Sequence, residues 1–161
     1  MDKDPLSIEL VSAGEADMPT LHSWFDSVKT IRDWGGPNMD YPLTLKALAL
    51  QIQLHDLHSF KLEDSAGNML AFGQCYIRCG RAHFARLVVA PSKRGLGLGG
   101  LLVLKLIELA PSLLETNGYS LFVAKDNKVA EQLYRSLGFL PTDYPETPSA
   151  EMACYLYMTR K

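Results

Sequence analysis

Three glycines at alternate positions, Gly95, Gly97 and Gly99, mark the segment of this sequence with the clearest chemical meaning. An apolar run at 85–91 precedes them and a second run at 101–104 follows, which predicts a strand, a glycine turn and a helix. Glycine lets the backbone approach a ligand closely, and the free N–H groups at a helix start attract phosphate. The expected ligand therefore carries a pyrophosphate.

The charges around this turn point the same way. No carboxylate lies between Asp64 and Glu108 in the sequence. The interval holds six basic residues, namely Arg78, Arg81, Arg86, Lys93, Arg94 and Lys105. An anion would be steered to such a region. The alternative is that these are ordinary solvated positions around a hairpin.

Two other phosphate-binding motifs compete for the same residues. Gly95, Gly97 and Gly100 form a literal GxGxxG, as in dinucleotide-binding folds. That fold requires repeated βαβ units and an acidic residue about 20 residues further on, whereas a β-meander is expected before this turn. A Walker loop is excluded because no Gly-Lys-Ser/Thr follows.

The length and composition predict one globular domain over residues 1–161, with 47% hydrophobic and 21% charged residues. A net charge of -2 argues against a dedicated nucleic-acid or membrane surface. Cys75, Cys79 and Cys154 are odd in number and lie in apolar segments, which favours free thiols in a reducing compartment. The N-terminal residues lack a secretion pattern, so we expect a cytoplasmic protein.

Hydrophobic periodicity and turn residues predict alternating elements along the chain. The expected strands lie at 8–11, 60–62, 69–78, 82–90, 119–124, from 139 and at 152–158. The expected helices lie at 18–28, after Thr44, at 98–115 and after Asp126 or Asn127, with a loop at 32–42. Pro111 should kink or restart the third helix. The apolar side of the last helix should comprise Val129, Ala130, Leu133, Tyr134 and Leu137.

This order of elements resembles the GNAT superfamily of acyl-CoA-dependent N-acyltransferases over nearly the whole chain. Two segments carry the resemblance. Residues 89–99 match the family motif Q/R-x-x-G-x-G/A, and residues 127–139 follow the frame Asn-x-x-Ala-x-x-x-Tyr-x-x-x-Gly-Phe. The resemblance implies an α/β (α+β) fold, with a mixed, mostly antiparallel sheet of about six to seven strands, about four flanking helices and a splayed central strand pair.

The resemblance also implies how acetyl-CoA is bound. Strand backbone groups of Leu87, Val88 and Val89 would meet the pantetheine arm, and the Val89 N–H would face the thioester oxygen. One such preorganised donor is typically worth about 10²- to 10³-fold in rate. The pyrophosphate would be held by main-chain groups of Arg94, Gly95, Leu96, Gly97, Leu98 and Gly99, with Gly100 beside them.

For the chemistry, the resemblance places Tyr134 beside the cofactor sulfur as general acid for the departing thiolate; the alternative is a core aromatic. Asn127 would contact the pantetheine amides or serve only as a helix cap. The glutamate that many members use as a base has no match here. His83 is a candidate base by type, against a structural role, and water or Asp33 are alternatives.

The acceptor is expected to be a cationic amine. Asp33, Trp34, Asp40 and Tyr41 suit a cation. The resemblance implies that this loop and the later residues Asp143, Tyr144 and Glu146 shape acceptor specificity; the alternative is that both sets are solvated loop residues. The resemblance implies an N-acetyltransferase that acts by direct attack on a small amine, with no metal and with a homodimer allowed. The alternatives are a protein N-terminal or lysine acetyltransferase, and a non-catalytic acyl-CoA-binding or sensing domain.

Overall fold

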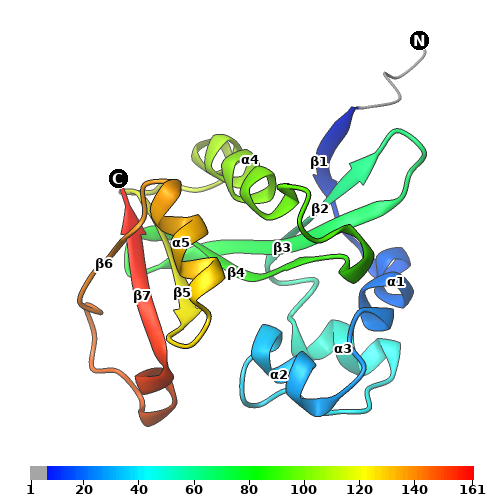
Figure 1. Cartoon of the computed structure of the whole chain (residues 1–161), viewed down its shortest axis with the longest axis horizontal. Coiled ribbons are helices and arrows are strands. Elements are labelled where there is room, and N and C mark those ends of the chain that lie inside the picture. The colour runs from blue at the N-terminus through cyan, green and yellow to red at the C-terminus, as the bar shows by residue number, and fades with distance from the viewer. Residues whose placement is uncertain (1–6) are drawn as a thin grey trace. The chain divides into compact units, whose positions relative to one another are not determined.

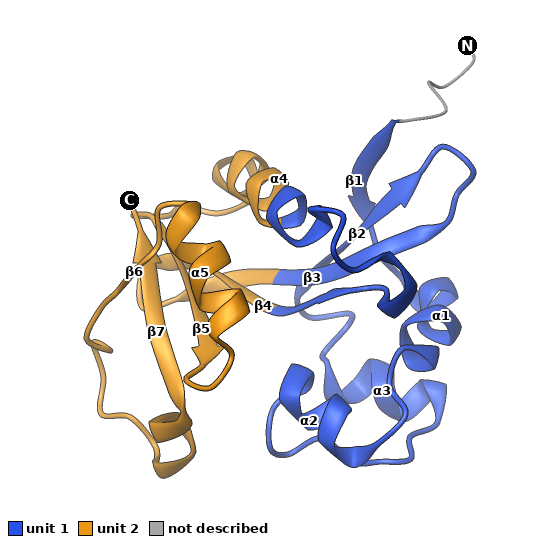
Figure 2. Ribbon diagram, viewed as in Figure 1, with its two compact units in different colours: residues 1–74, 86–102 blue, residues 75–85, 103–161 orange. Residues whose placement is uncertain are grey.

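The computed structural model describes residues 7–161, and these form two compact units (Figures 1 and 2). Unit 1 comprises the chain up to Gln74 together with Arg86–Leu102. Unit 2 comprises Cys75–Ala85 and Val103–Lys161. Two strands and one helix contribute residues to both units. A single domain over the whole chain remains a prediction.

The elements alternate between helices and strands, as the resemblance implies. The helices are α1 (Met18–Ser23), α2 (Val28–Gly35), α3 (Leu45–Gln51), α4 (Leu98–Leu113) and α5 (Lys128–Ser136). The strands are β1 (Ile8–Ser12), β2 (His58–Asp64), β3 (Met69–Arg78), β4 (Arg81–Val89), β5 (Tyr119–Ala124), β6 (Leu140–Pro141) and β7 (Tyr155–Arg160). The seven strands are hydrogen-bonded in the order β1-β2-β3-β4-β5-β7-β6. The predicted mixed α/β fold is confirmed.

The sheet contains both antiparallel and parallel strand pairs. β1 with β2, β5 with β7 and β6 with β7 are antiparallel, whereas β4 and β5 are parallel. The β4–β5 register runs from Ala82 opposite Tyr119 to Phe84 opposite Leu121. The described pairing stops there, although β4 continues to Val89 and β5 to Ala124. The splayed central strand pair stays a prediction.

The apolar core of unit 1 is built by its three helices and β3. Its buried members are Met18, Leu21, Phe25, Ile31, Met39, Leu48, Ala49, Ile52, Leu54 and Phe72. Thr44 caps α3 as predicted, because its Oγ1 accepts a hydrogen bond from the Ala47 N–H at 3.1 Å. In the turn at 64–68, the Asp64 carboxylate accepts hydrogen bonds from the Ala66 and Asn68 amides.

The expected helix at 18–28 is wrong, because two helices occupy this region. α1 ends at Ser23 and α2 begins at Val28, whose side chain is exposed. Ser27 starts the second helix: its Oγ accepts from the Thr30 N–H, while the Ser27 N–H donates to Thr30 Oγ1. This reciprocal cap resembles a capping box. The predicted loop at 32–42 is therefore helical up to Gly35.

Unit 2 contains β5 and β7 side by side, and its buried residues include Leu121, Val123, Phe139 and Met158. The Cys79–Gly80 turn joins β3 to β4, with positive φ at both residues. Asn127 caps α5, and Gly138 follows it at φ 92°. Val129 was expected on the apolar side, but its side chain is 82% exposed because the helix turns it to solvent.

Pro111 was predicted to kink or restart the long helix, and the restart is wrong, since α4 continues through Pro111 to Leu113. A proline lacks the N–H that would bond the carbonyl four residues earlier, which here belongs to Ile107. The Tyr119 hydroxyl donates to that Ile107 oxygen at 3.2 Å. A tyrosine of the next strand thus satisfies the group that the proline leaves free.

Two other expected boundaries are wrong. α4 ends at Leu113 instead of running to residue 115, and Gly118 stands just before β5 with φ 128°. The expected strand at 152–158 begins only at Tyr155, because residues 150–154 form a 3₁₀ helix. β7 then continues to Arg160, where it pairs with the start of β5 at Tyr119. Terminal boundaries of this kind depend on pairing partners far along the chain.

Candidate active site

The glycine turn of unit 1 has the geometry of an anion-binding loop. Gly95 and Gly97 have φ values of +79° and +80°, and an added Cβ at either position would meet no heavy atom within 4 Å. α4 begins at Leu98, and Leu101 N donates to Gly97 O at 3.1 Å. The amides of the first helical turn therefore precede this bond and need another acceptor. Phosphate fits here, because the open space lies beside the positive end of a sixteen-residue helix.

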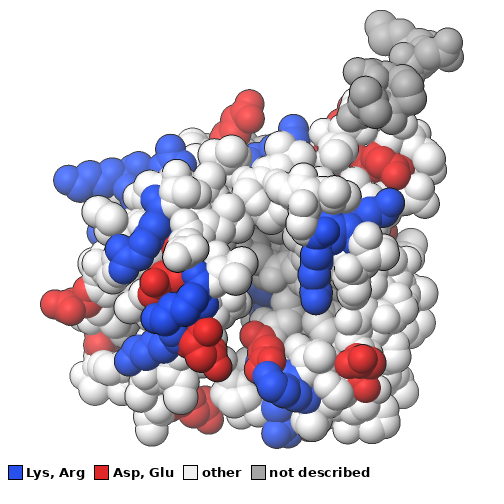
Figure 3. All heavy atoms as spheres, in the orientation of Figure 1, with Lys and Arg blue, Asp and Glu red and all other residues white. Residues whose placement is uncertain are grey.

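The basic residues of the interval are divided between the two units. Lys93 and Arg94 lie on the exposed glycine turn in unit 1, whereas Arg78 and Arg81 lie in unit 2. Figure 3 shows Lys and Arg interspersed with Asp and Glu over the face in view. Only Lys93 and Arg94 stand next to the glycines, so the electrostatic attraction at the turn is local.

β4 changes direction at Arg86, immediately before the three residues expected to meet pantetheine. Arg86 has φ +51°, which is uncommon for a residue with a Cβ. Its carbonyl accepts from Trp34 Nε1 at 2.7 Å, and its Nη1 donates to Gln74 Oε1 at 2.8 Å. Gln74 is buried and donates in turn to Ile52 O and Ser59 Oγ. This network within unit 1 holds the strand where Leu87, Val88 and Val89 begin.

Tyr134 and Asn127 lie on α5 in unit 2. Tyr134 is half-buried, its ring packs edge-on to Phe139 at 6.3 Å, and desolvation raises its pKa to about 12. Its phenol therefore keeps its proton at neutral pH, as a general acid must. Asn127 Oδ1 accepts from the Ala130 N–H at 3.2 Å. The cap thus uses the side-chain oxygen of Asn127 and leaves its NH₂ group as the donor for a ligand.

His83, the candidate base, is buried in unit 2 with only 2% of its surface exposed. Its Nδ1 lies 2.8 Å from Ser120 Oγ, and its ring contacts Phe122 and Tyr76. Desolvation, with the positive charge of Arg78 as a second cause, lowers the pKa of His83 to about 3. Such a weak, enclosed imidazole is a poor proton acceptor at neutral pH, and this environment favours the structural role.

The four predicted acceptor residues all lie in unit 1, and three are already engaged. Asp33 pairs with Lys29 at 2.5 Å on the exposed side of α2. Trp34 stacks on Phe25 at 4.5 Å and gives its N–H to Arg86, so it belongs to the core of this unit. Asp40 accepts from Gln51 Nε2 at 2.8 Å. Tyr41 is exposed.

Sequence reasoning singled out Tyr144 in the late loop but missed the aromatic face of unit 2 that this residue joins. Arg78 of β3, Phe122 of β5 and Tyr157 of β7 come together with Tyr144 from the segment between β6 and β7. Alternation along β5 and β7 would have placed Phe122 and Tyr157 on one side of each strand. Only the register, which sets Phe122 opposite Tyr157, makes them neighbours.

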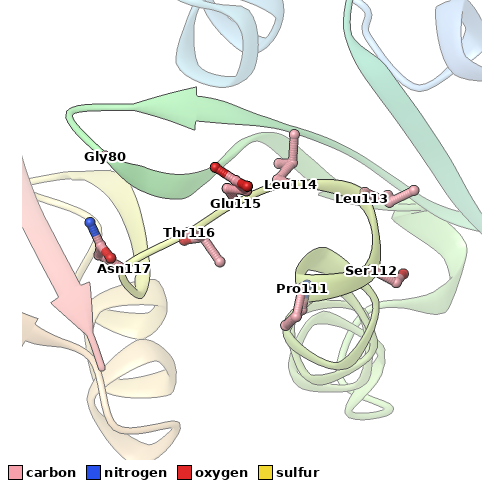
Figure 4. Close-up of a pocket in the computed structure, with 8 residues that line it drawn as sticks. All are labelled: Gly80, Pro111, Ser112, Leu113, Leu114, Glu115, Thr116 and Asn117. Atoms are coloured by element: carbon pink, nitrogen blue, oxygen red, sulfur yellow. The ribbon is translucent and has the colours of Figure 1, made fainter.

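A hollow of about 630 Å³ lies in unit 2 at the end of α4 (Figure 4). It is lined by Gly80 and by residues 111–117, none of which belongs to the predicted site. Within the described part of the chain, no group of three His, Cys, Asp or Glu side chains is placed to hold a metal ion. No helix in residues 7–161 is long and apolar enough to cross a membrane.

The fold and the glycine turn define the class of acyl-CoA-dependent acyltransferases. The model of the acetyltransferase (GNAT) family matches residues 21–139. The chain therefore belongs to the GNAT family and is an acetyl-CoA-dependent N-acetyltransferase with an amine acceptor, as the sequence predicted.

Solved structures share the fold. A spermidine N-acetyltransferase from Vibrio cholerae, in complex with CoA and spermine, has a TM-score of 0.71 and 19% identity, with 94% of this chain and 92% of that chain covered. A chimeric form of the Vibrio cholerae enzyme gives a TM-score of 0.72 at 18% identity, with 95% and 94% covered. A dodecameric form of it gives a TM-score of 0.67 at 19% identity, with 94% and 91% covered.

Proposed function

We propose that this protein transfers the acetyl group of acetyl-CoA to a primary amine of a small molecule by direct attack. The observation that carries the proposal is the glycine turn, where Gly95 and Gly97 leave open space at the start of α4 within the matched family region. The spermidine N-acetyltransferases with the same fold support a small amine as acceptor. A protein N-terminus or lysine is the rival acceptor.

Each half of the coenzyme has its own residues in this proposal. The main-chain N–H groups from Arg94 to Gly100 hold the pyrophosphate, since residues 94–97 are exposed and the segment leads into the first turn of α4. Leu87 and Val88 offer backbone groups to pantetheine, and the Val89 N–H stabilises the thioester oxyanion. Asn127 contributes its side-chain NH₂ to the pantetheine amides.

The acetyl transfer requires one proton donor, which is Tyr134 in this proposal. The neutral amine nitrogen forms a bond to the thioester carbonyl carbon, and the oxygen takes up the negative charge. The intermediate collapses with cleavage of the C–S bond, and the sulfur receives the phenolic proton of Tyr134. The proton that the amine nitrogen loses restores the phenol through solvent. Because the pKa of Tyr134 is raised to about 12, the phenol is protonated at the start of each turnover.

Deprotonation of the incoming ammonium is assigned to water in this proposal. His83 is enclosed and has a lowered pKa, and Asp33 is exposed and paired with Lys29. A water-mediated route requires no buried base, and it leaves Tyr134 as the residue whose loss most affects chemistry. A cytoplasmic location and a homodimer remain predictions.

A thiol-release assay tests the proposal. Purified protein is incubated with acetyl-CoA and with a panel of small amines, amino acids, polyamines and peptides, and free CoA is measured. Turnover with at least one small amine, and none with peptides, is the expected result. Turnover with peptides alone would show that the acceptor is a protein N-terminus or lysine. Tight CoA binding without any turnover would identify a non-catalytic sensing domain.

A further inference from the structure

One arginine of unit 2 packs against two aromatic rings, those of Phe122 and Tyr144, which also contact each other. The guanidinium carbon of Arg78 lies 5.0 Å from the ring centre of Phe122 and 5.6 Å from that of Tyr144. Such contacts stabilise the cation and fix the plane of the guanidinium. A fixed plane directs its N–H groups, which favours recognition of a flat anion such as a carboxylate.

The polar partners of Arg78 are neutral hydroxyl groups. Its Nε donates to the Tyr144 hydroxyl at 3.0 Å, and its Nη1 lies 3.4 Å from the Tyr76 hydroxyl. Burial disfavours the charge, but these hydroxyls more than offset it, so the pKa of Arg78 is raised. Within residues 7–161, no carboxylate oxygen lies within ion-pair distance of Arg78. Glu146 instead accepts from Cys79 Sγ at 3.6 Å.

A second, independent group lies on the same pair of rings. Tyr157 is only 4% exposed, its ring packs on Phe122 at 5.5 Å, and it meets the edge of Tyr144 at 5.1 Å. Its hydroxyl is buried and has no hydrogen-bond partner among the described residues. A buried hydroxyl without a partner is costly, and a ligand oxygen would satisfy it.

We propose that Arg78 and the Tyr157 hydroxyl bind the carboxylate of the acceptor, so that the preferred substrate is a small amine that also carries a carboxylate. This rests on the proposed function and names its substrate class. A polyamine is cationic along its length, and an arginine would repel it. The carboxylates once expected to attract a cation, Asp33 and Asp40, already pair with Lys29 and Gln51.

The test compares amino acids with their own amides, in which a neutral carboxamide of similar size replaces the carboxylate. In the thiol-release assay, the wild-type protein should use the acid at least about tenfold better in kcat/KM, mainly through KM. Arg78→Met should reduce that preference at least about tenfold and leave kcat/KM for the amide unchanged. Arg78→Lys should retain part of the preference. Arg81→Met, three residues further along the same hairpin, is the matched control and should keep the preference.

Tyr157→Phe keeps the buried ring and removes the hydroxyl, so it reports on the site even if Arg78→Met fails to fold. This variant should lower kcat/KM for the amino acid and leave kcat/KM for its amide unchanged. Calorimetric titration of the amino acid into the CoA-bound protein gives a readout without turnover. Equal use of acid and amide, or better use of spermidine, would overturn the inference and leave the acetyltransferase proposal standing. If the wild type binds the amino acid but releases no thiol, and Arg78→Met loses this binding, only the proposed function would be overturned.

Discussion

The two units carry glycines of opposite surroundings, and this contrast separates recognition from folding. Gly97 in unit 1 has φ +80° and open space where a Cβ would be, whereas Gly118 in unit 2 has φ +128° and the Arg160 carbonyl oxygen 2.7 Å from that point. The first glycine leaves room for a ligand, and the second lets two backbone segments approach. The same residue type with positive φ therefore serves different purposes.

Their side chains differ in the same way. The proposed pyrophosphate loop of unit 1 works through main-chain N–H groups, so its glycines matter mainly because they lack a side chain. In unit 2, Tyr134, Arg78 and Tyr157 would act through their own hydroxyl and guanidinium groups. We therefore expect the loop to respond to added bulk, and unit 2 to respond to the removal of single atoms.

The largest effect is expected from removing one oxygen in unit 2. Tyr134→Phe should lower kcat by about 10²- to 10³-fold, because the thiolate leaves without a proton donor. The Kd for CoA should not change. Single-turnover acetylation and calorimetry measure the two quantities. An unchanged rate under conditions where chemistry limits turnover would contradict the role of Tyr134.

Adding bulk to the loop of unit 1 should affect binding instead. Gly97→Val places a branched side chain on the proposed phosphate path and should weaken CoA more than about tenfold, or about 1.4 kcal/mol. Gly67→Val is the matched control, since Gly67 has φ +85° and equally open space in the β2–β3 turn. Equal CoA affinity in both variants would mean that the loop does not bind the coenzyme.

The stability of the protein should depend on pH through His83 of unit 2. Its folded pKa of about 3 lies below its ordinary value of 6.5, so the unfolded chain takes up the proton first as the pH falls. Stability should be complete above pH 6.5 and decline toward pH 3, by at most about 1.4 kcal/mol per pH unit. Urea titrations at several pH values give the free energy of unfolding. This free energy should fall less steeply with decreasing pH in His83→Gln than in the wild type, whereas the exposed control His58→Gln should keep the wild-type dependence.

A smaller loss is expected at the glycine of unit 2 that faces backbone. Gly118→Ala should destabilise the fold by about 2 kcal/mol, from positive φ and from overlap with the Arg160 carbonyl. Gly80→Ala has φ +77° and only an ordinary contact with Asn117, so it should cost about 1 kcal/mol. Denaturation midpoints would measure both variants, and equal midpoints would show that the carbonyl contact is unimportant.

The smallest effect should follow the loss of the hydroxyl that compensates Pro111. Tyr119→Phe leaves the Ile107 carbonyl without its donor and should cost about 1 kcal/mol. In the Pro111→Ala background the helix supplies its own N–H, so the same change should cost less. A double-mutant cycle in urea measures this coupling. Additive effects would rule it out.

Local sequence signals predicted the glycine turn and the helix after it, because both depend on consecutive residues. Gly95, Gly97 and the first turn of α4 are consecutive, so spacing alone predicts a turn with free amides. Caps were found where one side chain closes them, as at Thr44 and Asn127. The Ser27–Thr30 cap was readable in the same way, and missing it produced the wrong helix at 18–28.

The other features required partners that are distant along the chain. Trp34 has the composition of an acceptor-binding residue, but its N–H is used by a carbonyl 52 positions away. His83 has the right type for a base, but neighbours from β3 and β5 enclose it. Spacing within one segment does not report such contacts, because burial and charge depend on the whole fold.

The sequence by itself determined most of the elements and the glycine turn, because backbone conformation and periodicity are properties of neighbouring residues, and its resemblance to two motifs indicated the family. The tertiary structure decided which side chains are free to meet a ligand. Strand register brought Arg78, Phe122, Tyr144 and Tyr157 together and enclosed His83, since side-chain surroundings arise only when strands pair.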